Sequence, residues 1–454
     1  MKLLCKCAIL VIAIIYLLQP FFPGDLSHFL FFNTLIVLAS ALPLQTKSFK
    51  QITLTFLGLG VLLLVYTQAA YNIWAQTTIS MTNVIAILIV MQLFTIPIEV
   101  GRYSEVIEFW LNQSFAKESS LFLFTTLLTH LFASFLLFGT VPVMVSLFGQ
   151  VLKNSVSNFE RFTAAAISRG YALVVLWAPG AINVFLVLQV TGVDWMDLFV
   201  PGLLLSIIGL LLSYYFESKT ALSKKPLPSK SSDSKLPMPE AKRKSLHIIA
   251  VVLGLVFGTV LFEKMQIGVS GNRIVLAGFI VSAIWTAYYA RDPKLPETIK
   301  QYWDIGVLKA VDLAALFIAM GAFAGAIDHS GILLEIRPYL QQVANQVGIL
   351  SLLLVPVIMI MMAVTGIHPF ISIVLLGKLL TSLQLPISNI SLALVLSLGG
   401  SISYILSPFG GIVLTLAKFI NAKISDITLR WNFAFSMVYL LIGILFSYCW
   451  SLLV

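Results

Sequence analysis

The chain has 454 residues, of which 59% are hydrophobic and 10% are charged. A soluble globular domain carries about 25% charged residues, so the composition excludes an ordinary soluble protein. The net charge of +9 does not indicate a nucleic-acid partner, because the basic residues lie in short loops between apolar blocks, as topology signals do. Apolar blocks of about twenty residues instead predict an all-α polytopic membrane protein, because only helices and closed barrels satisfy their backbone in a bilayer.

We predict eleven membrane crossings. In chain order they are residues 7–22, 28–44, 52–74, 79–98, 162–191, 196–216, 245–263, 271–290, 306–327, 388–420 and 430–452. The first follows a basic start but lacks a convincing small-residue cleavage site, so we interpret it as a retained helix rather than a signal peptide. Residues 1–27 are therefore an extra N-terminal transmembrane helix.

Two further apolar stretches, 120–151 and 348–380, are about thirty residues long and are interrupted near the middle by glycine and proline. One crossing needs about twenty residues and two need about forty, so a re-entrant hairpin fits this length better. If neither stretch crosses, most basic loop residues fall on one side. The positive-inside rule then predicts a multi-pass inner (plasma) membrane protein with a cytoplasmic N-terminus and an extracytoplasmic C-terminus.

A polar linker at 217–244 divides the chain and is rich in Pro, Ser and Lys, which predicts a flexible cytoplasmic segment. Its basic residues fit a plain positive-inside linker, and a lipid-binding polybasic segment is the alternative. Residues 28–216 and 245–454 each hold five crossings and one hairpin. An odd number of crossings makes the second copy run opposite to the first, which predicts two inverted-topology repeats, a feature of many secondary transporters.

Short sequence matches support the repeat. Each hairpin has a Gly–Pro interruption, Gly139-Thr140-Val141-Pro142 and Gly366-Ile367-His368-Pro369. The crossings 162–191 and 388–420 are interrupted by Pro179 and Pro408, which predicts broken helices. Upstream of the two prolines, Ser168 and Gly170 correspond to Ser397 and Gly399 at the same offset.

The order of amphipathic stretch, hairpin, broken helix and last helix resembles the ion transporter superfamily, which includes divalent anion:sodium symporters, citrate transporters and arsenite permeases. The resemblance covers residues 28–452. It implies an elevator mechanism, with hairpins and broken helices as a moving domain and the other helices as a dimerising scaffold, and hence a homodimer. Dicarboxylate members carry Ser-Asn-Thr at each hairpin tip. The tips here contain no Asn, and Thr140 and Thr365 supply the hydroxyl groups.

A broken helix exposes N–H groups that attract anions at one new end and carbonyl groups that suit Na⁺ at the other. We therefore predict a binding site where the breaks and hairpin tips meet. The predicted substrate-binding residues are Thr140, Arg169, Asn183, Thr365, His368, Ser403 and Ser407, and the predicted ion-binding residues are Gly139, Pro179, Gly366 and Pro408. No Asp or Glu lies in residues 348–420, which favours an anionic or neutral organic substrate over cation/proton antiport.

Two of these residues have competing interpretations. Arg169 could hold an anionic substrate or replace Na⁺ at carbonyl ends, and the alternative is a snorkelling or carbonyl-capping arginine. His368 could couple transport to protons or donate to the substrate, and the alternative is a histidine that caps the hairpin tip.

The predicted function is secondary active transport of a small, anionic solute coupled to H⁺ or Na⁺. The expected partners are the small-molecule or ion substrate and membrane lipids, with no nucleic acid. We predict no cofactor apart from a possible Na⁺, and no enzymatic activity, since no P-loop or clustered acids are present. A lipid carrier or flippase on the same repeat, or a lipid-phosphate enzyme, is the alternative.

Overall fold

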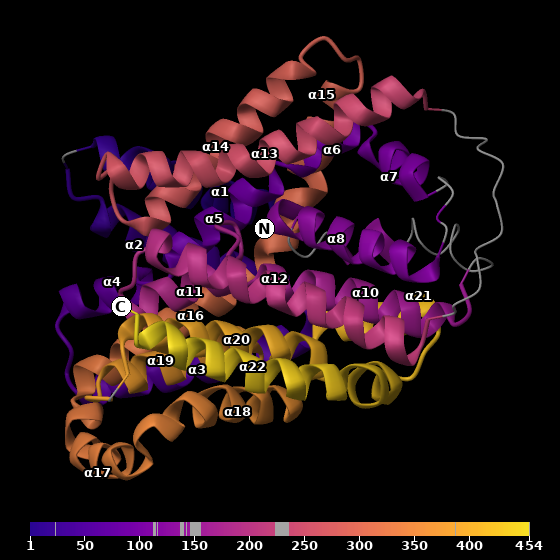
Figure 1. Cartoon of the computed structure of the whole chain (residues 1–454). Coiled ribbons are helices and arrows are strands. Elements are labelled where there is room, and N and C mark those ends of the chain that lie inside the picture. Colours follow the sequence, from indigo (N-terminus) through magenta and orange to yellow (C-terminus); the bar gives the residue numbers. More distant parts are fainter. Residues whose placement is uncertain are drawn as a thin grey trace. The chain divides into compact units, whose positions relative to one another are not determined.

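The computed structural model describes residues 1–22, 24–111, 115, 117–136, 140–141, 143–145, 156–222, 236–385 and 387–453. These residues form helices and no strands (Figure 1). Eleven of the described helical segments are long and apolar enough to cross a membrane. The all-α polytopic fold predicted from the sequence is therefore confirmed.

Nine of the eleven segments correspond to predicted crossings, and two do not. Two segments that overlap the predicted hairpins 120–151 and 348–380 are long enough to cross. They are Glu118–Leu136 and Arg337–Val364. The predicted crossing 28–44 is a shorter helix of 15 residues, and 162–191 is divided into two short helices. Length alone does not distinguish a hairpin arm from a crossing, since both are apolar helices of similar size.

The chain divides into two compact units, each drawing on both halves of the sequence. Unit 1 comprises Met1–Val100, Gly254–Gln346 and Ser382–Gln384. Its elements are α1 (Lys2–Leu18), η1 (Gln19–Phe21), α2 (Ser27–Ala41), α3 (Lys47–Tyr66), α4 (Tyr71–Ile79), α5 (Thr82–Gln92), α6 (Thr95–Val100), the second half of α13 (Met238–Lys264), α14 (Ser270–Tyr288), α15 (Leu295–Gln301), η3 (Tyr302–Gly306), η4 (Val307–Ala310), α16 (Val311–Ser330) and α17 (Ile332–Val347).

The core of unit 1 is α16, which packs on α3 and α4. The carboxylate of Asp312 at the start of α16 accepts hydrogen bonds from the Thr46 backbone N–H (2.8 Å) and hydroxyl (3.2 Å). Thr46 precedes α3, so this carboxylate satisfies a backbone donor that the helix start leaves free and adds a negative charge at its positive end.

Unit 2 comprises Gly101–Leu253, Val347–Thr381 and Leu385–Val454. Its elements are α7 (Tyr103–Leu111), α8 (Glu118–Leu136), α10 (Phe159–Val174), α11 (Ile182–Thr191), α12 (Trp195–Thr220), the first half of α13, η5 (Gly348–Leu350), α18 (Ser351–Val364), α19 (Pro369–Thr381), α20 (Asn389–Leu406), α21 (Gly411–Ile420), η6 (Asp426–Asn432) and α22 (Phe433–Ser451). α8 packs on α10, and α18 packs on α20. The same pairing of a hairpin arm with a broken helix thus occurs in both halves of the sequence.

Both predicted helix breaks are present. α10 ends at Val174 and α11 begins at Ile182, with Pro179 between them, and α20 and α21 are separated at Pro408. Proline lacks an N–H and disfavours helical geometry in the preceding residue, which explains why each helix stops there.

The predicted hairpins are described unequally. In 348–380, α18 and α19 pack together and are joined by a turn in which Gly366 has φ +101°, a conformation that side chains disfavour. In 120–151, α8 is described, but Gly139 and several neighbours lie outside the described residues. Of the predicted linker 217–244, residues 223–235 also lie outside them, while α12 extends to Thr220 and α13 begins at Met238.

Candidate functional site

The first helix break borders a small cavity within unit 2. Its walls come from five helices: α8 contributes Ala133, α10 contributes Tyr171 and Val174, the break contributes Val175 and Ala181, α11 contributes Ile182 and Asn183, α19 contributes Phe370, and α20 contributes Tyr404. None of the described residues that line it is charged. The cavity therefore lies between the end of α10 and the start of α11, against helices of the second half of the chain.

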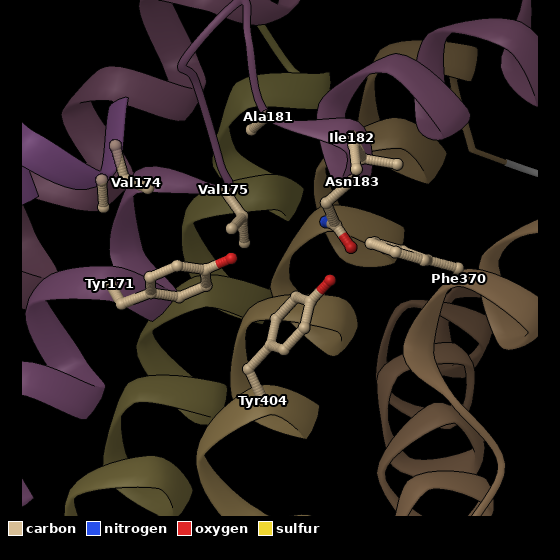
Figure 2. A pocket seen from close by; sticks show the side chains of 9 residues that line it. Tyr171, Val174, Val175, Ala181, Ile182, Asn183, Phe370 and Tyr404 are labelled. Atoms are coloured by element: carbon tan, nitrogen blue, oxygen red, sulfur yellow. The ribbon is translucent and has the colours of Figure 1, made fainter. Parts of the chain in front are cut away.

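Three polar groups point into this space. Figure 2 shows the hydroxyl groups of Tyr171 and Tyr404 and the amide oxygen of Asn183 directed toward one another. The two tyrosine rings meet edge to face, with centroids 5.9 Å apart. Both hydroxyl groups and the amide nitrogen can donate hydrogen bonds, and the start of α11 adds the free N–H groups and partial positive charge of a helix N-terminus. The arrangement suits a small anion or another hydrogen-bond acceptor.

The side chain of Asn183 is the most informative feature. It is 1% exposed, and neither its Oδ1 nor its Nδ2 atom has a hydrogen-bond partner. Buried polar groups in proteins almost always have partners, and leaving one without costs about 1–3 kcal/mol. An unpaired amide at the end of a broken helix is therefore expected of a binding site in which the ligand supplies the missing hydrogen-bond partner.

A glycine on α20 makes room for this amide. A Cβ atom at Gly400 would lie 2.6 Å from Asn183 Oδ1 and 2.8 Å from its Nδ2, too close without movement. The close packing of α11 on α20 therefore depends on the missing side chain at Gly400, and it fixes the position of the amide beside the cavity.

The cavity is small, at about 10 Å³. That is about the space that one water molecule needs. A larger solute therefore requires its walls to move, and the structure represents a closed arrangement of this site.

Apart from Arg169, the other predicted site residues that the structure describes lie around the two breaks and tips. Among the predicted site residues in the described part of the chain, only Asn183 lines the cavity. The ring of His368 packs against Phe370 and Tyr404, with centroids 4.4 and 6.1 Å away, so it lies one residue layer behind the cavity wall. Thr140 and Ser403 are fully buried with unpaired hydroxyl groups, and neither lines the cavity.

The second break and the second hairpin tip are held together by Ser407. Its hydroxyl group donates to the Ala363 carbonyl (2.7 Å), near the end of α18. Thr365 is exposed and donates to the carbonyl of Met362 in its own helix (2.8 Å). Pro179 lies in the first break and Pro408 in the second, and Gly366 lies in the tip between α18 and α19. Their predicted roles in binding ions stay predictions.

Arg169 lies elsewhere in unit 2, within a buried network. It is fully buried, and its Nε atom donates to Asn432 Oδ1 (2.8 Å) while its Nη2 atom donates to Glu217 Oε1 (2.9 Å) and the Trp431 carbonyl (2.8 Å). Glu217 also accepts from Arg161 (3.0 Å). Trp431 and Asn432 belong to the π-helix η6, whose irregular backbone leaves a carbonyl free to accept. Arg169 does not line the cavity, and its proposed contact with substrate stays a prediction.

Sequence reasoning did not predict the lining residues Tyr171, Tyr404 and Phe370, since an aromatic residue in an apolar helix is typical of packing. A signal was present. Relative to the prolines of the two breaks, Tyr171 corresponds to Gly400 and Val175 corresponds to Tyr404. Within each broken helix the two positions, Tyr171 and Val175 or Gly400 and Tyr404, are four residues apart and therefore share one helix face. All four residues lie at or beside the cavity.

A further pair joins equivalent positions of the two halves. Ser401 on α20 donates to the Ala172 carbonyl on α10 at 2.7 Å, and the two residues lie seven positions before Pro408 and Pro179. Contact between equivalent positions is what packing about a local two-fold axis produces, so it supports the inverted repeat.

Comparisons with known proteins point to transport. The family described as "Tripartite ATP-independent periplasmic transporter, DctM component" matches residues 153–450, about two thirds of the chain. The structure is similar to that of the YdaH transporter of Alcanivorax borkumensis, with a TM-score of 0.63, 12% identity and coverage of 88% of this chain and 98% of that one. It is also similar to Neisseria gonorrhoeae MtrF, described in a study of antimetabolite efflux pumps, with a TM-score of 0.52, 11% identity and coverage of 88% and 95%.

At these identities the two structures show a shared fold and no more. No match was found among curated protein sequences. The findings support a family of secondary transporters and not an enzyme. They do not single out the ion transporter superfamily, whose resemblance stays a prediction.

Proposed function

The chain belongs to the family of DctM components of tripartite ATP-independent periplasmic transporters, and on this premise we propose that it carries a small, anionic solute across the cytoplasmic membrane. The observation that supports this most directly is the unpaired, buried amide of Asn183 in a cavity at the break between α10 and α11. In the proposed complex, the anionic group of the solute accepts hydrogen bonds from the two tyrosine hydroxyl groups and the first N–H groups of α11. It also accepts from Asn183 Nδ2, once the amide has turned its nitrogen atom toward the cavity.

Neutral donors suit a carrier that must release its cargo. A full positive charge in the cavity would bind an anion more strongly and would itself be costly to leave unpaired after release. Hydrogen bonds from amide and hydroxyl groups are weaker and directional. Binding by such groups is therefore compatible with repeated loading and unloading.

The proposed transport cycle is of the elevator type. Unit 2 holds both broken helices and the described hairpin helices, and we assign it the moving role. Unit 1 is then the scaffold, through which we propose that the chain forms a homodimer. Because the closed cavity has room for about one water molecule, loading requires displacement of a wall, and α19, which carries Phe370, is the wall contributed by the second hairpin.

The proposed energy source is a gradient of Na⁺ or H⁺, with carbonyl groups at the broken helix ends as ligands for Na⁺. The N-terminus is placed in the cytoplasm and the C-terminus outside. The word "tripartite" in the family description implies two further components, so we propose that this chain forms the transport pathway together with partner subunits.

The test uses purified protein in a thermal-shift screen against carboxylates, oxyanions and amino acids, with and without Na⁺, followed by uptake of each hit into proteoliposomes. Tyr404→Phe removes a hydroxyl group that points into the cavity, and we expect it to reduce the ligand-induced shift and uptake. Tyr439→Phe is the matched control. Its buried hydroxyl group donates to the Leu205 carbonyl at 2.9 Å, outside the cavity.

The control variant should lower thermal stability while retaining the ligand response. If the ligand-induced shift is equal in Tyr404→Phe and the unaltered protein, the ligand does not bind in the cavity. Stabilisation by cationic compounds alone would overturn the anionic class of the substrate.

A further inference from the structure

A second cavity in unit 2 has a different chemistry. It measures about 270 Å³ and lies between α7, α8 and the start of α13. Its lining is apolar apart from Trp110 and Ser245, and includes Ile107, Leu128 and Ile248. Apolar cavities of about 150 Å³ stay free of water and accept apolar guests, so a cavity of this size and lining favours a hydrocarbon occupant.

The two polar groups in the lining have partners. Trp110 Nε1 donates to Ser245 Oγ at 2.8 Å, and Ser245 Oγ donates to the Ala241 carbonyl at 2.9 Å. These bonds join the end of α7 to the start of α13. None of the lining side chains that the structure describes carries a charge, so these residues have little to hold a polar solute.

Two lysines stand at the helix starts that border the cavity. Lys242 is one turn before Ser245 and seven residues before Ile249, so it shares the cavity-facing side of α13. Lys117 immediately precedes α8, and it lies seven residues before Phe124 and eleven before Leu128, on the cavity-facing side of that helix. Seven and eleven residues are close to whole numbers of helical turns.

Both lysines are free to bind an anion. Each is exposed, and neither has an ion-pair partner in the part of the chain that the structure describes. Lys244, two residues after Lys242 in α13, differs because it is buried and paired with Glu240 at 3.0 Å. The arrangement thus combines an apolar cavity with two unpaired ammonium groups at the helix starts beside it.

We propose that this cavity binds one acyl chain of an anionic phospholipid, with the lipid phosphate at Lys117 and Lys242. The complementarity is twofold, since the hydrocarbon enters the dry cavity and the phosphate meets the ammonium groups. A juxtamembrane lysine contributes attraction to anionic lipid that corresponds to a factor of about five in affinity. This site is separate from the transport site and does not depend on the proposed solute.

Brominated phospholipids provide the test, because bromine atoms on the acyl chain quench tryptophan fluorescence on contact. Protein in a neutral detergent is titrated with phosphatidylglycerol carrying brominated chains, and with phosphatidylcholine carrying the same chains. We expect saturable quenching by phosphatidylglycerol that is reduced in Trp110→Phe, which removes the tryptophan in the cavity and keeps an aromatic ring.

Charge variants then test the headgroup site. Lys117→Gln and Lys242→Gln should each weaken the apparent affinity for phosphatidylglycerol about fivefold, and together about 25-fold. Lys418→Gln, at an exposed lysine of α21, is the matched control and should leave the affinity unchanged.

Three results would overturn the proposal. Equal affinity for phosphatidylglycerol and phosphatidylcholine would show that the lysines select no headgroup. Quenching that is unchanged in Trp110→Phe would place the acyl chain elsewhere. Equal weakening by Lys418→Gln would show a general effect of surface charge.

Discussion

Replacing Asn183 by leucine should stabilise the protein while abolishing its response to substrate. The amide is buried with both polar atoms unpaired, and such a group costs about 1–3 kcal/mol. Leucine has the same number and branching of side-chain heavy atoms and no polar atom, and the strain of its larger methyl groups against Gly400 should cost up to about 1.5 kcal/mol. From the middle of the first range, about 2 kcal/mol, less this strain, we expect a net gain of about 0.5–2 kcal/mol in the free energy of unfolding.

Asn432→Leu is the matched comparison, because Asn432 is also buried but fully bonded. It accepts from Arg169 Nε (2.8 Å) and donates to Ser168 Oγ (3.1 Å) and the Ile427 carbonyl (2.9 Å). Hydrogen bonds to charged groups contribute about 1.5–3 kcal/mol, so this variant should lose about 2–4 kcal/mol. The two substitutions, identical in chemistry, should thus change stability in opposite directions.

The measurement is unfolding by titration with sodium dodecyl sulfate in mixed micelles, with thermal shift against the best ligand as the functional readout. Asn183→Leu should unfold at higher detergent fraction and show no ligand-induced shift. A loss of stability in Asn183→Leu comparable to that of Asn432→Leu would mean that Asn183 has protein partners, and the argument for a prepared site would then fail.

Two further substitutions test the packing around these groups. Gly400→Ala places a Cβ atom 2.6 Å from Asn183 Oδ1, so we expect it to lower the free energy of unfolding by about 1–3 kcal/mol and to weaken the ligand response. Gly58→Ala is the control. Gly58 has open space around it, so this change should alter the free energy of unfolding by about 1 kcal/mol or less. Arg169→Met removes the cation that pairs with the buried carboxylate of Glu217, and we expect it to lower stability by about 3–5 kcal/mol and reduce the folded fraction recovered from membranes. An Arg169→Met protein that is as stable as the original but fails to bind ligand would show that Arg169 contacts the substrate instead.

The helix breaks could be predicted because their causes are local. Pro179 and Pro408 each remove a backbone donor and restrict the residue before them, whatever surrounds the helix. The eleven apolar segments were equally accessible from composition. Assigning Glu118–Leu136 to a hairpin arm or a crossing was not, since that depends on a membrane boundary that a run of apolar residues does not mark.

The site residues depend on tertiary packing, and there the sequence was less informative. Asn183, which lines the cavity, was among the predicted residues because it is an amide beside a helix break, and its role in binding stays a prediction. Tyr171 and Tyr404 were missed, as an aromatic residue in an apolar helix packs far more often than it binds. Arg169 was recognised as costly at its depth, but its partners Glu217 and Asn432 are 48 and 263 residues away and no local pattern joins them.

The separation of charge from the cavity bears on how a carrier returns empty. Unit 2 contains a fully buried arginine, and its charge is met by Glu217, Asn432 and a backbone carbonyl rather than by a vacant site. Had this cation faced the cavity, each release of an anion would have left it buried and unpaired, at a cost of about 3–5 kcal/mol. The unpaired amide of Asn183 costs about 1–3 kcal/mol when empty, and one water molecule, for which the closed cavity has room, can reduce that cost. In the proposed cycle, a neutral site would therefore lower the barrier for the unloaded protein to change conformation, which favours transport over permanent binding as the use of this cavity.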